Sequence, residues 1–260
     1  MRNLHKAYYK DYYNDLNFGY LLNNGEGSKI EIMRRNTNLT ATNLLQKIHR
    51  NPSTNQSFEL IIAYPGLVTG VGINHEAKIE GEFKLGVHFD WTYGMPVIYG
   101  SSVKGVLRYS FLSKTERGKI IEYDGYFLEK VTKRHWDPEE IKILFDGIFE
   151  GKDKDGKNYS IYNRDIFFDA VITQADKKGR ILCSDSITPH DDNPLKNPVP
   201  ITFLKIAPGC KLEFRFKLVD TQIGDYVFTI EDKLLLFKKI LTTVGIGAKT
   251  NVGYGQLKSI

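Results

Sequence analysis

The sequence predicts an α+β fold, in which helices cover one face of an open antiparallel sheet. Three observations favour it: short apolar or alternating segments resemble strands, turn residues separate them, and helical segments interrupt them. Their order along the chain is strand, helix, strands, helix, strand, as in a ferredoxin-like βαββαβ unit with insertions. We therefore expect one domain over residues 58–260, preceded by a helical N-terminal extension over residues 1–57.

The extension is predicted from helical periodicity. An apolar and aromatic stripe recurs there at helical spacing, formed by Leu4, Tyr8, Tyr12 and Leu16 and widened by Tyr9 and Tyr13. A second helix is expected from Thr40 to His49, between the possible cap Asn38 and the breaker Pro52. Packing against the domain or a partner is the common role of such a stripe, and stacking on bases is the alternative.

The elements of the domain follow from local patterns. Strands are expected at residues 58–63, 77–89, 165–173, 180–184, 201–206, 211–219 and 254–258, and helices at 101–112, 137–149 and 231–244. Residues 77–89 alternate between apolar and polar, which is typical of a half-buried strand. Pro138 in a first turn with acidic neighbours indicates a helix start. Residues 175–179 are expected to join their flanking strands in a hairpin.

Composition excludes several classes of protein. Hydrophobic residues make up 41% and charged residues 26% of the 260, as in ordinary globular domains. The two cysteines, Cys183 and Cys210, form no CxxC motif, so we expect neither a zinc knuckle nor a disulfide framework, and a reducing cytoplasm fits them. The polar N-terminus is unlike a secretory signal, and no apolar run approaches the about 20 residues that cross a bilayer. The net charge of +5 suits contact with phosphates but does not require it.

A first candidate site lies at the junction of residues 94–108, GMPVIYGSSVKGVLR. Ser101 or Ser102 is expected to cap the helix, and Gly100 allows a ligand to approach the backbone closely. Free amide groups and the helix dipole favour an anion there, and Lys104 and Arg108 share one helix face. An ordinary capped helix with two solvated basic residues is the alternative. Because Val106 stands where a Walker A loop requires lysine, nucleotide hydrolysis is disfavoured.

A second candidate site is the glycine-rich segment of residues 245–257, GIGAKTNVGYGQL, between a helix and the last strand. Glycines permit positive φ, and the exposed amide groups can form an anion-binding nest. Lys249 is the natural phosphate contact. The segment is not a dinucleotide fingerprint, since a helix precedes it and Thr250 stands where glycine is required.

Together these two segments resemble the RAMP superfamily of CRISPR-associated proteins, over roughly residues 60–258. Residues 67–72 (LVTGVG) are also similar to that family. Residues 183–190 (CSDSITPH), followed by 198–201 (PVPI), are most similar to the sixth subunit of the Cmr, or type III-B, effector complex. In contrast to such junctions, which commonly have proline at the strand end, this chain has Tyr99, which could stack on a base.

The resemblance implies an RRM-like fold and a non-catalytic RNA-binding subunit in antiviral defence. It would lie near the 3′ end of the guide RNA (crRNA), in contact with other Cmr-type RAMP subunits and with target RNA in reach. The residues expected to contact RNA are Gly100, Ser101, Ser102, Lys104, Arg108, Gly247, Lys249, Thr250 and Asn251.

No catalytic, metal or cofactor site is predicted. His75-Glu76 lacks the second histidine of a zincin motif, because Ile79 stands in its place. The loop of residues 70–76, where related backbone subunits carry a cleaving aspartate, has none. Two alternatives stay open. One is a metal-independent endoribonuclease that processes guide precursors, with His75 or His190 as base and Lys249 as cation. The other is an assembly protein whose glycine loops only shape turns.

Overall fold

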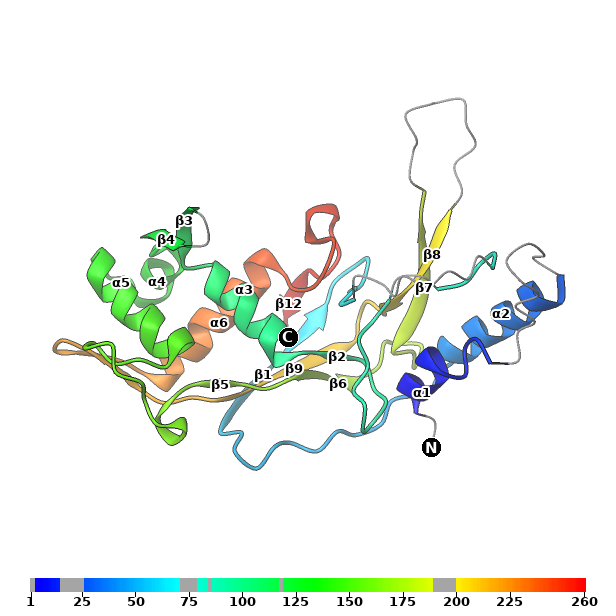
Figure 1. Cartoon of the computed structure of the whole chain (residues 1–260), viewed down its shortest axis with the longest axis horizontal. Helices are drawn as coiled ribbons and strands as arrows, with labels where there is room; N and C mark the ends of the chain where they lie inside the picture. Colours follow the sequence, from blue (N-terminus) through cyan, green and yellow to red (C-terminus); the bar gives the residue numbers. More distant parts are fainter. Residues whose placement is uncertain (1–2, 15–25, 71–78, 84–85, 117–118, 189–199) are drawn as a thin grey trace, which may run out of the picture.

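The structure is a computed structural model that describes residues 3–14, 26–70, 79–83, 86–116, 119–188 and 200–260 (Figure 1). Its helices are α1 (Leu4–Tyr9), α2 (Glu26–Leu39), α3 (Gly100–Tyr109), α4 (Tyr126–Thr132), α5 (Pro138–Phe145) and α6 (Ile230–Val244), with short helical turns η1 (Asp146–Glu150), η2 (Ile161–Asn163) and η3 (Thr250–Val252). Its strands are β1 (Gln56–Ile62), β2 (Val97–Ile98), β3 (Leu112–Glu116), β4 (Lys119–Tyr123), β5 (Ile166–Phe167), β6 (Ala170–Gln174), β7 (Leu182–Ile187), β8 (Ile201–Ile206), β9 (Lys211–Lys217), β10 (Thr221–Ile223), β11 (Tyr226–Phe228) and β12 (Leu257–Ser259). No described helix is long and apolar enough to span a bilayer.

The central sheet confirms the predicted α+β, ferredoxin-like class. Its strands lie in the order β12-β1-β9-β6-β2, with β5 also paired to β9, and all of these pairings are antiparallel. Along the chain, β1, α3, β6, β9, α6 and β12 form the βαββαβ unit. Its first and third strands, β1 and β9, therefore lie at the centre of the sheet.

The two faces of the sheet have different covers (Figure 1). On one face, helices pack on apolar side chains of β9; the ring of Phe216 lies 5.4 Å from that of Phe237 in α6. On the other face, the chain before β1 passes across charged residues of the same strand. Arg215 donates to the carbonyls of Ile48 and His49, at 3.2 Å each, and Glu213 forms ion pairs with Arg215 and Arg50.

The helix predicted from Thr40 to His49 is wrong, because this segment is extended. Thr42 forms a β-bridge with Arg180, and Asn43 has a left-handed φ of 58° that a helix does not allow. Leu44, Leu45 and Ile48 pack against the core from this extended chain. The apolar residues of this segment therefore face the core, but they do so from an extended chain that packs across the sheet.

The strand predicted over residues 77–89 is also wrong in its described parts. Gly81 turns the chain at a φ of 83°, and the backbone of Phe83 pairs with tyrosine hydroxyls in place of a strand. Tyr8 donates to the Phe83 carbonyl, and the Phe83 amide donates to Tyr12, each at 2.9 Å. Leu4, Tyr8 and Tyr12 are buried, which confirms the packing role of the N-terminal stripe; Leu16 lies outside the described residues. The division into an extension and a domain stays a prediction.

The hairpin predicted around residues 175–179 is half right. These residues form a tight turn, in which Gly179 donates to the carbonyl of Asp176. However, β6 pairs with β9 and β2, whereas β7 pairs with β8 in a separate sheet. The helices starting near Ser101, Pro138 and Glu231 are confirmed, while α4 and the pairs β3–β4 and β10–β11 lie where no element was expected.

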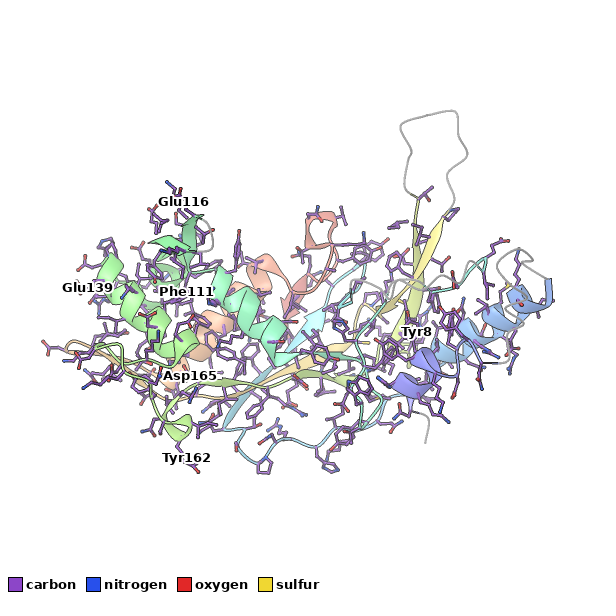
Figure 2. The ribbon with its side chains drawn as sticks, in the orientation of Figure 1. Tyr8, Phe111, Glu116, Glu139, Tyr162 and Asp165 are labelled. Atoms are coloured by element: carbon purple, nitrogen blue, oxygen red, sulfur yellow. The ribbon has the colours of Figure 1, made fainter. Side chains whose placement is uncertain are left out.

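A buried ion pair joins Lys233, in the first turns of α6, to Asp165, which is labelled in Figure 2. The ammonium of Lys233 lies 2.6 Å from a carboxylate oxygen of Asp165, and the two side chains are 0% and 1% exposed. Lys233 also donates to the carbonyl of Val219, and the Val219 amide donates to Asp165. Both charges are therefore held by hydrogen bonds inside the core.

Removing one member of this pair should strongly destabilise the fold. We expect Asp165→Asn to lower the free energy of unfolding by about 3 kcal/mol, since it leaves a buried ammonium unpaired. The double variant Asp165→Asn/Lys233→Met should be more stable than the single one. Urea unfolding measures both, and a single variant as stable as the native chain would contradict the prediction.

Candidate nucleic-acid interface

The start of α3 is built differently from the sequence prediction. The N-cap is Tyr99, and the side chains of Ser101 and Ser102 cap nothing; both serines lie exposed in the first turn. The amide of Gly100 donates to a carboxylate oxygen of Asp169 at 2.7 Å. A Cβ atom on Gly100 would lie 2.1 Å from the carbonyl oxygen of Phe167, so this glycine allows α3 to pack against β5. The serine cap is therefore wrong, and a carboxylate already occupies part of the predicted anion site.

The outer face of α3 is exposed, and no described side chain covers the helix backbone at Gly105. Ser101, Gly105 and Tyr109 follow one another at a spacing of four and are exposed, whereas Val103 and Leu107 are buried. A Cβ atom on Gly105 would meet nothing within 4 Å. Gly105 therefore leaves the backbone of α3 uncovered at the middle of this face.

The two basic residues of α3 have different surroundings. Lys104 is partly exposed and forms no ion pair within the described part of the chain. Arg108 forms an ion pair with Glu150 at 3.1 Å, and its guanidinium lies 4.9 Å from the centre of the Phe145 ring. Lys104 is thus the available cation of the predicted pair, whereas Arg108 already has an acidic partner.

The glycine-rich loop between α6 and β12 is tied to itself and to the chain after β1. Ile246 donates to the carbonyl of Gly255, and Gly255 donates to that of Gly66. Gly247 and Gly255 have φ values of 96° and 71°. A Cβ atom on Gly255 would lie 1.9 Å from the carbonyl oxygen of Ile246, and one on Gly247 2.5 Å from that of Val68. Gly247 is therefore required by packing, whatever else it contacts.

The outer turn of this loop presents free backbone donors. Lys249 is left-handed, with a φ of 61°, and the single turn η3 follows directly. No described residue accepts a hydrogen bond from the amides of Lys249, Thr250 or Asn251. Successive amides in such a left-handed to right-handed turn form an anion-binding nest. The Lys249 side chain is partly exposed and has no ion-pair partner among the described residues.

The loop is anchored at its far side by Tyr254. The phenol donates to a carboxylate oxygen of Asp185 at 2.7 Å, and Lys205 pairs with the same carboxylate. Burial would raise the pKa of Asp185, but the hydrogen bonds from Lys205 and Tyr254 outweigh it, so this pKa lies below its usual value. The residues between 183 and 188 that resemble the family therefore support the glycine loop.

Neutralising Asp185 should loosen this anchor in a pH-dependent way. We expect Asp185→Asn to lower the free energy of unfolding by about 1 kcal/mol at neutral pH, where the carboxylate is charged in both states. Because folding lowers the pKa of Asp185, its charged carboxylate stabilises the folded state at any pH above the unfolded pKa, near 3.8. This stabilisation is lost as the pH falls through the lower pKa of the folded state. Urea unfolding at neutral and acidic pH should show the difference shrinking below about pH 3.8; a constant difference would contradict it.

The structure describes neither of the two histidines considered for catalysis. His75 and His190 lie outside the described residues, as does most of the loop of residues 70–76. His88 stacks on Tyr99 with ring centres 4.9 Å apart, and burial lowers its pKa. His135 contacts Glu129 at 2.8 Å on the surface. Within the described ranges, no three His, Cys, Asp or Glu side chains gather as metal ligands. The absence of catalysis stays a prediction.

Sequence reasoning found Lys104 and the nest but missed two features of the site. Asp169 lies 69 residues from Gly100 along the chain, and no local pattern pairs them. Gly105 was visible as a glycine inside a predicted helix, and its exposed position follows from the buried Val103 and Leu107.

Comparisons with known proteins show the family of this chain. A family model described as the RAMP superfamily matches residues 59–258. A chain in the cryo-EM structure of the type III-B Cmr-beta bound to cognate target RNA has a TM-score of 0.49 and 20% identity; the match covers 78% of this chain and 57% of that one. The crystal structure of Cmr6 from Pyrococcus furiosus has a TM-score of 0.46 and 20% identity, covering 81% of this chain and 100% of that one. No curated protein matches the chain.

Proposed function

The chain belongs to the RAMP superfamily, and from this membership we propose that it is a non-catalytic RNA-binding subunit of a type III-B CRISPR effector ribonucleoprotein. In this proposal it holds the guide RNA backbone near the 3′ end and contacts neighbouring RAMP subunits. The observation that carries the proposal is the nest of Lys249, Thr250 and Asn251, whose free amides and adjacent ammonium suit a phosphate.

The outer face of α3 supplies a second backbone contact. The hydroxyls of Ser101 and Ser102 can donate to phosphate or ribose oxygens, and Lys104 adds a cation without an ion-pair partner among the described residues. Gly105 lets the sugar–phosphate chain approach the helix. Contacts of these kinds position RNA without reading its sequence, as a subunit must when guide sequences differ.

Replacing the lysines should weaken RNA binding almost equally for all sequences. For Lys104→Ala and Lys249→Ala we expect the slope of log K against log salt to become shallower by about 0.7 each, the effect of one lost phosphate contact on a single strand. Fluorescence anisotropy with labelled single-stranded RNA at several salt concentrations measures it.

Lys154→Ala is the matched control for this experiment, because Lys154 is an exposed lysine in another loop. It should leave the slope unchanged. Arg108→Ala should have a smaller effect than Lys104→Ala, since Glu150 already neutralises this guanidinium. A changed sequence preference with an unchanged slope would contradict the backbone-binding role.

Gly105→Ala should affect stability and binding in opposite directions. Alanine favours a helix by about 1 kcal/mol over glycine, and the new methyl group meets no atom of the chain, so we expect higher stability. If RNA approaches the helix here, the same methyl group should weaken binding several-fold. Thermal unfolding and anisotropy measure the two effects, and a variant that gains stability without losing affinity would place the RNA elsewhere.

Incubation with labelled guide precursor tests the non-catalytic character. We expect the purified chain to bind the precursor without cutting it and, in its native host, to copurify with mature guide RNA and other RAMP subunits. Cleavage by the isolated chain that disappears in His75→Ala or His190→Ala would show that it is an RNA-processing endoribonuclease instead.

A further inference from the structure

A short hairpin next to α3 carries an exposed tryptophan. The amide of Asp90 donates to the carbonyl of Met95, and the amide of Val97 donates to the carbonyl of His88, so residues 88–97 fold back on themselves. This hairpin leads into β2, which is followed by α3. Trp91 lies at the tip, where its side chain is 75% exposed. The indole N–H of Trp91 donates no hydrogen bond to a described residue. It is therefore exposed to solvent together with the ring.

Helix α1 places the ring of His5 against this tip and the ring of Tyr9 beside His5. The amide of Leu4 donates to the carbonyl of Gly94 at 3.1 Å, and a Cβ atom on Gly94 would lie 2.4 Å from the side chain of Asn3. This close docking places the His5 ring 4.2 Å from Trp91 and 4.7 Å from Tyr9. We refer to His5, Tyr9 and Trp91 as the aromatic platform.

The aromatic platform is not needed to complete the core. Beneath it, Tyr8 and Phe89 are buried and in mutual contact, with ring centres 5.7 Å apart. Tyr9 meets Phe89 edge-on at 6.2 Å and is still 36% exposed. The outer rings thus rest on a core that is already packed and turn their free surface to solvent.

The aromatic platform continues toward the proposed RNA surface of α3. Tyr9 meets the ring of Phe89 in the hairpin, and His88 immediately precedes Phe89. Tyr99 stacks on His88 and immediately precedes Gly100, Ser101 and Ser102. Rings therefore extend from α1 across the hairpin to the first turn of α3.

Charges near the rings favour nucleobases over phosphates. Asp169 lies beside Tyr99, since it accepts a hydrogen bond from the amide of Gly100. Burial raises the pKa of Tyr99, and the carboxylates of Asp169 and Asp90 raise it further. Two carboxylates repel a phosphate, but they do not oppose an uncharged base, and they can accept hydrogen bonds from its amino group. Aromatic faces stack on any base, and this requires no particular sequence.

We infer that the aromatic platform stacks unpaired bases of the RNA whose backbone is held at α3. This inference rests on the proposed function and adds to it a contact with bases that is independent of phosphate. Because stacking does not release counterions, replacing Trp91 should weaken binding without changing its salt slope, unlike Lys104→Ala and Lys249→Ala.

The sequence provides its own optical probe for this contact. The chain has two tryptophans, Trp91 at 75% exposure and Trp136 at 2%. Titration of the full chain with a short oligouridylate should quench the Trp91 emission, whereas Trp91→Phe, which keeps only the buried tryptophan, should show almost no quenching. In anisotropy, Trp91→Ala should bind about tenfold more weakly at every salt concentration, as expected for one lost base stack.

Tyr162→Ala is the matched control, since Tyr162 is 78% exposed and lies far from Tyr8 of α1 (Figure 2). It should bind as tightly as the native chain. If the native chain binds RNA without quenching and Trp91→Ala binds as tightly, the platform is overturned and the proposed function stays intact.

If Trp91→Ala keeps its RNA affinity but no longer binds a neighbouring subunit, this surface is a protein contact instead. No RNA binding by the native chain would overturn the proposed function and the platform with it.

Discussion

The structure depends on backbone-to-backbone contact at the glycine loop, where no side chain fits. At Gly255 and Gly247 a Cβ atom would lie 1.9 Å and 2.5 Å from carbonyl oxygens of Ile246 and Val68. These contacts fix the path from the end of α6 into β12, the strand that flanks β1 in the sheet. They also hold Lys249 and the following turn at the surface, with amides that donate to no described residue. The same glycines that allow this packing also shape the turn that we propose as an anion-binding nest.

The second constraint is the cover on the far face of the sheet. In RRM domains that face stacks bases on its aromatic residues. Here Arg215, Glu213 and Arg50 form an ion-pair network on it, and the extended chain around Ile48 and His49 accepts hydrogen bonds from Arg215. The proposed RNA contacts therefore do not involve these strand residues. They are the nest at Lys249, the face of α3 and the exposed rings near Trp91.

Local patterns predicted the elements whose causes are local. The proline and acidic residues at the start of α5 are visible in the sequence, and α3, α5 and α6 lie where helices were expected. Residues 40–49 and 77–89 failed because distant partners determine their conformation: Arg215 and Arg180 for the first, and the hydroxyls of Tyr8 and Tyr12 for the second. The site follows the same rule. The nest could be predicted from four glycines around a lysine, whereas the Arg108–Glu150 pair and the Asp169 contact could not.

Hydrogen exchange of the backbone amides tests the central claim most directly. The amides of Lys249, Thr250 and Asn251 make no hydrogen bond to a described residue, so they should exchange fast in the free chain. If they donate to an RNA phosphate, saturation with single-stranded RNA should slow their exchange, and high salt should reverse the effect. Unchanged exchange at these three residues while the RNA is bound would contradict the account.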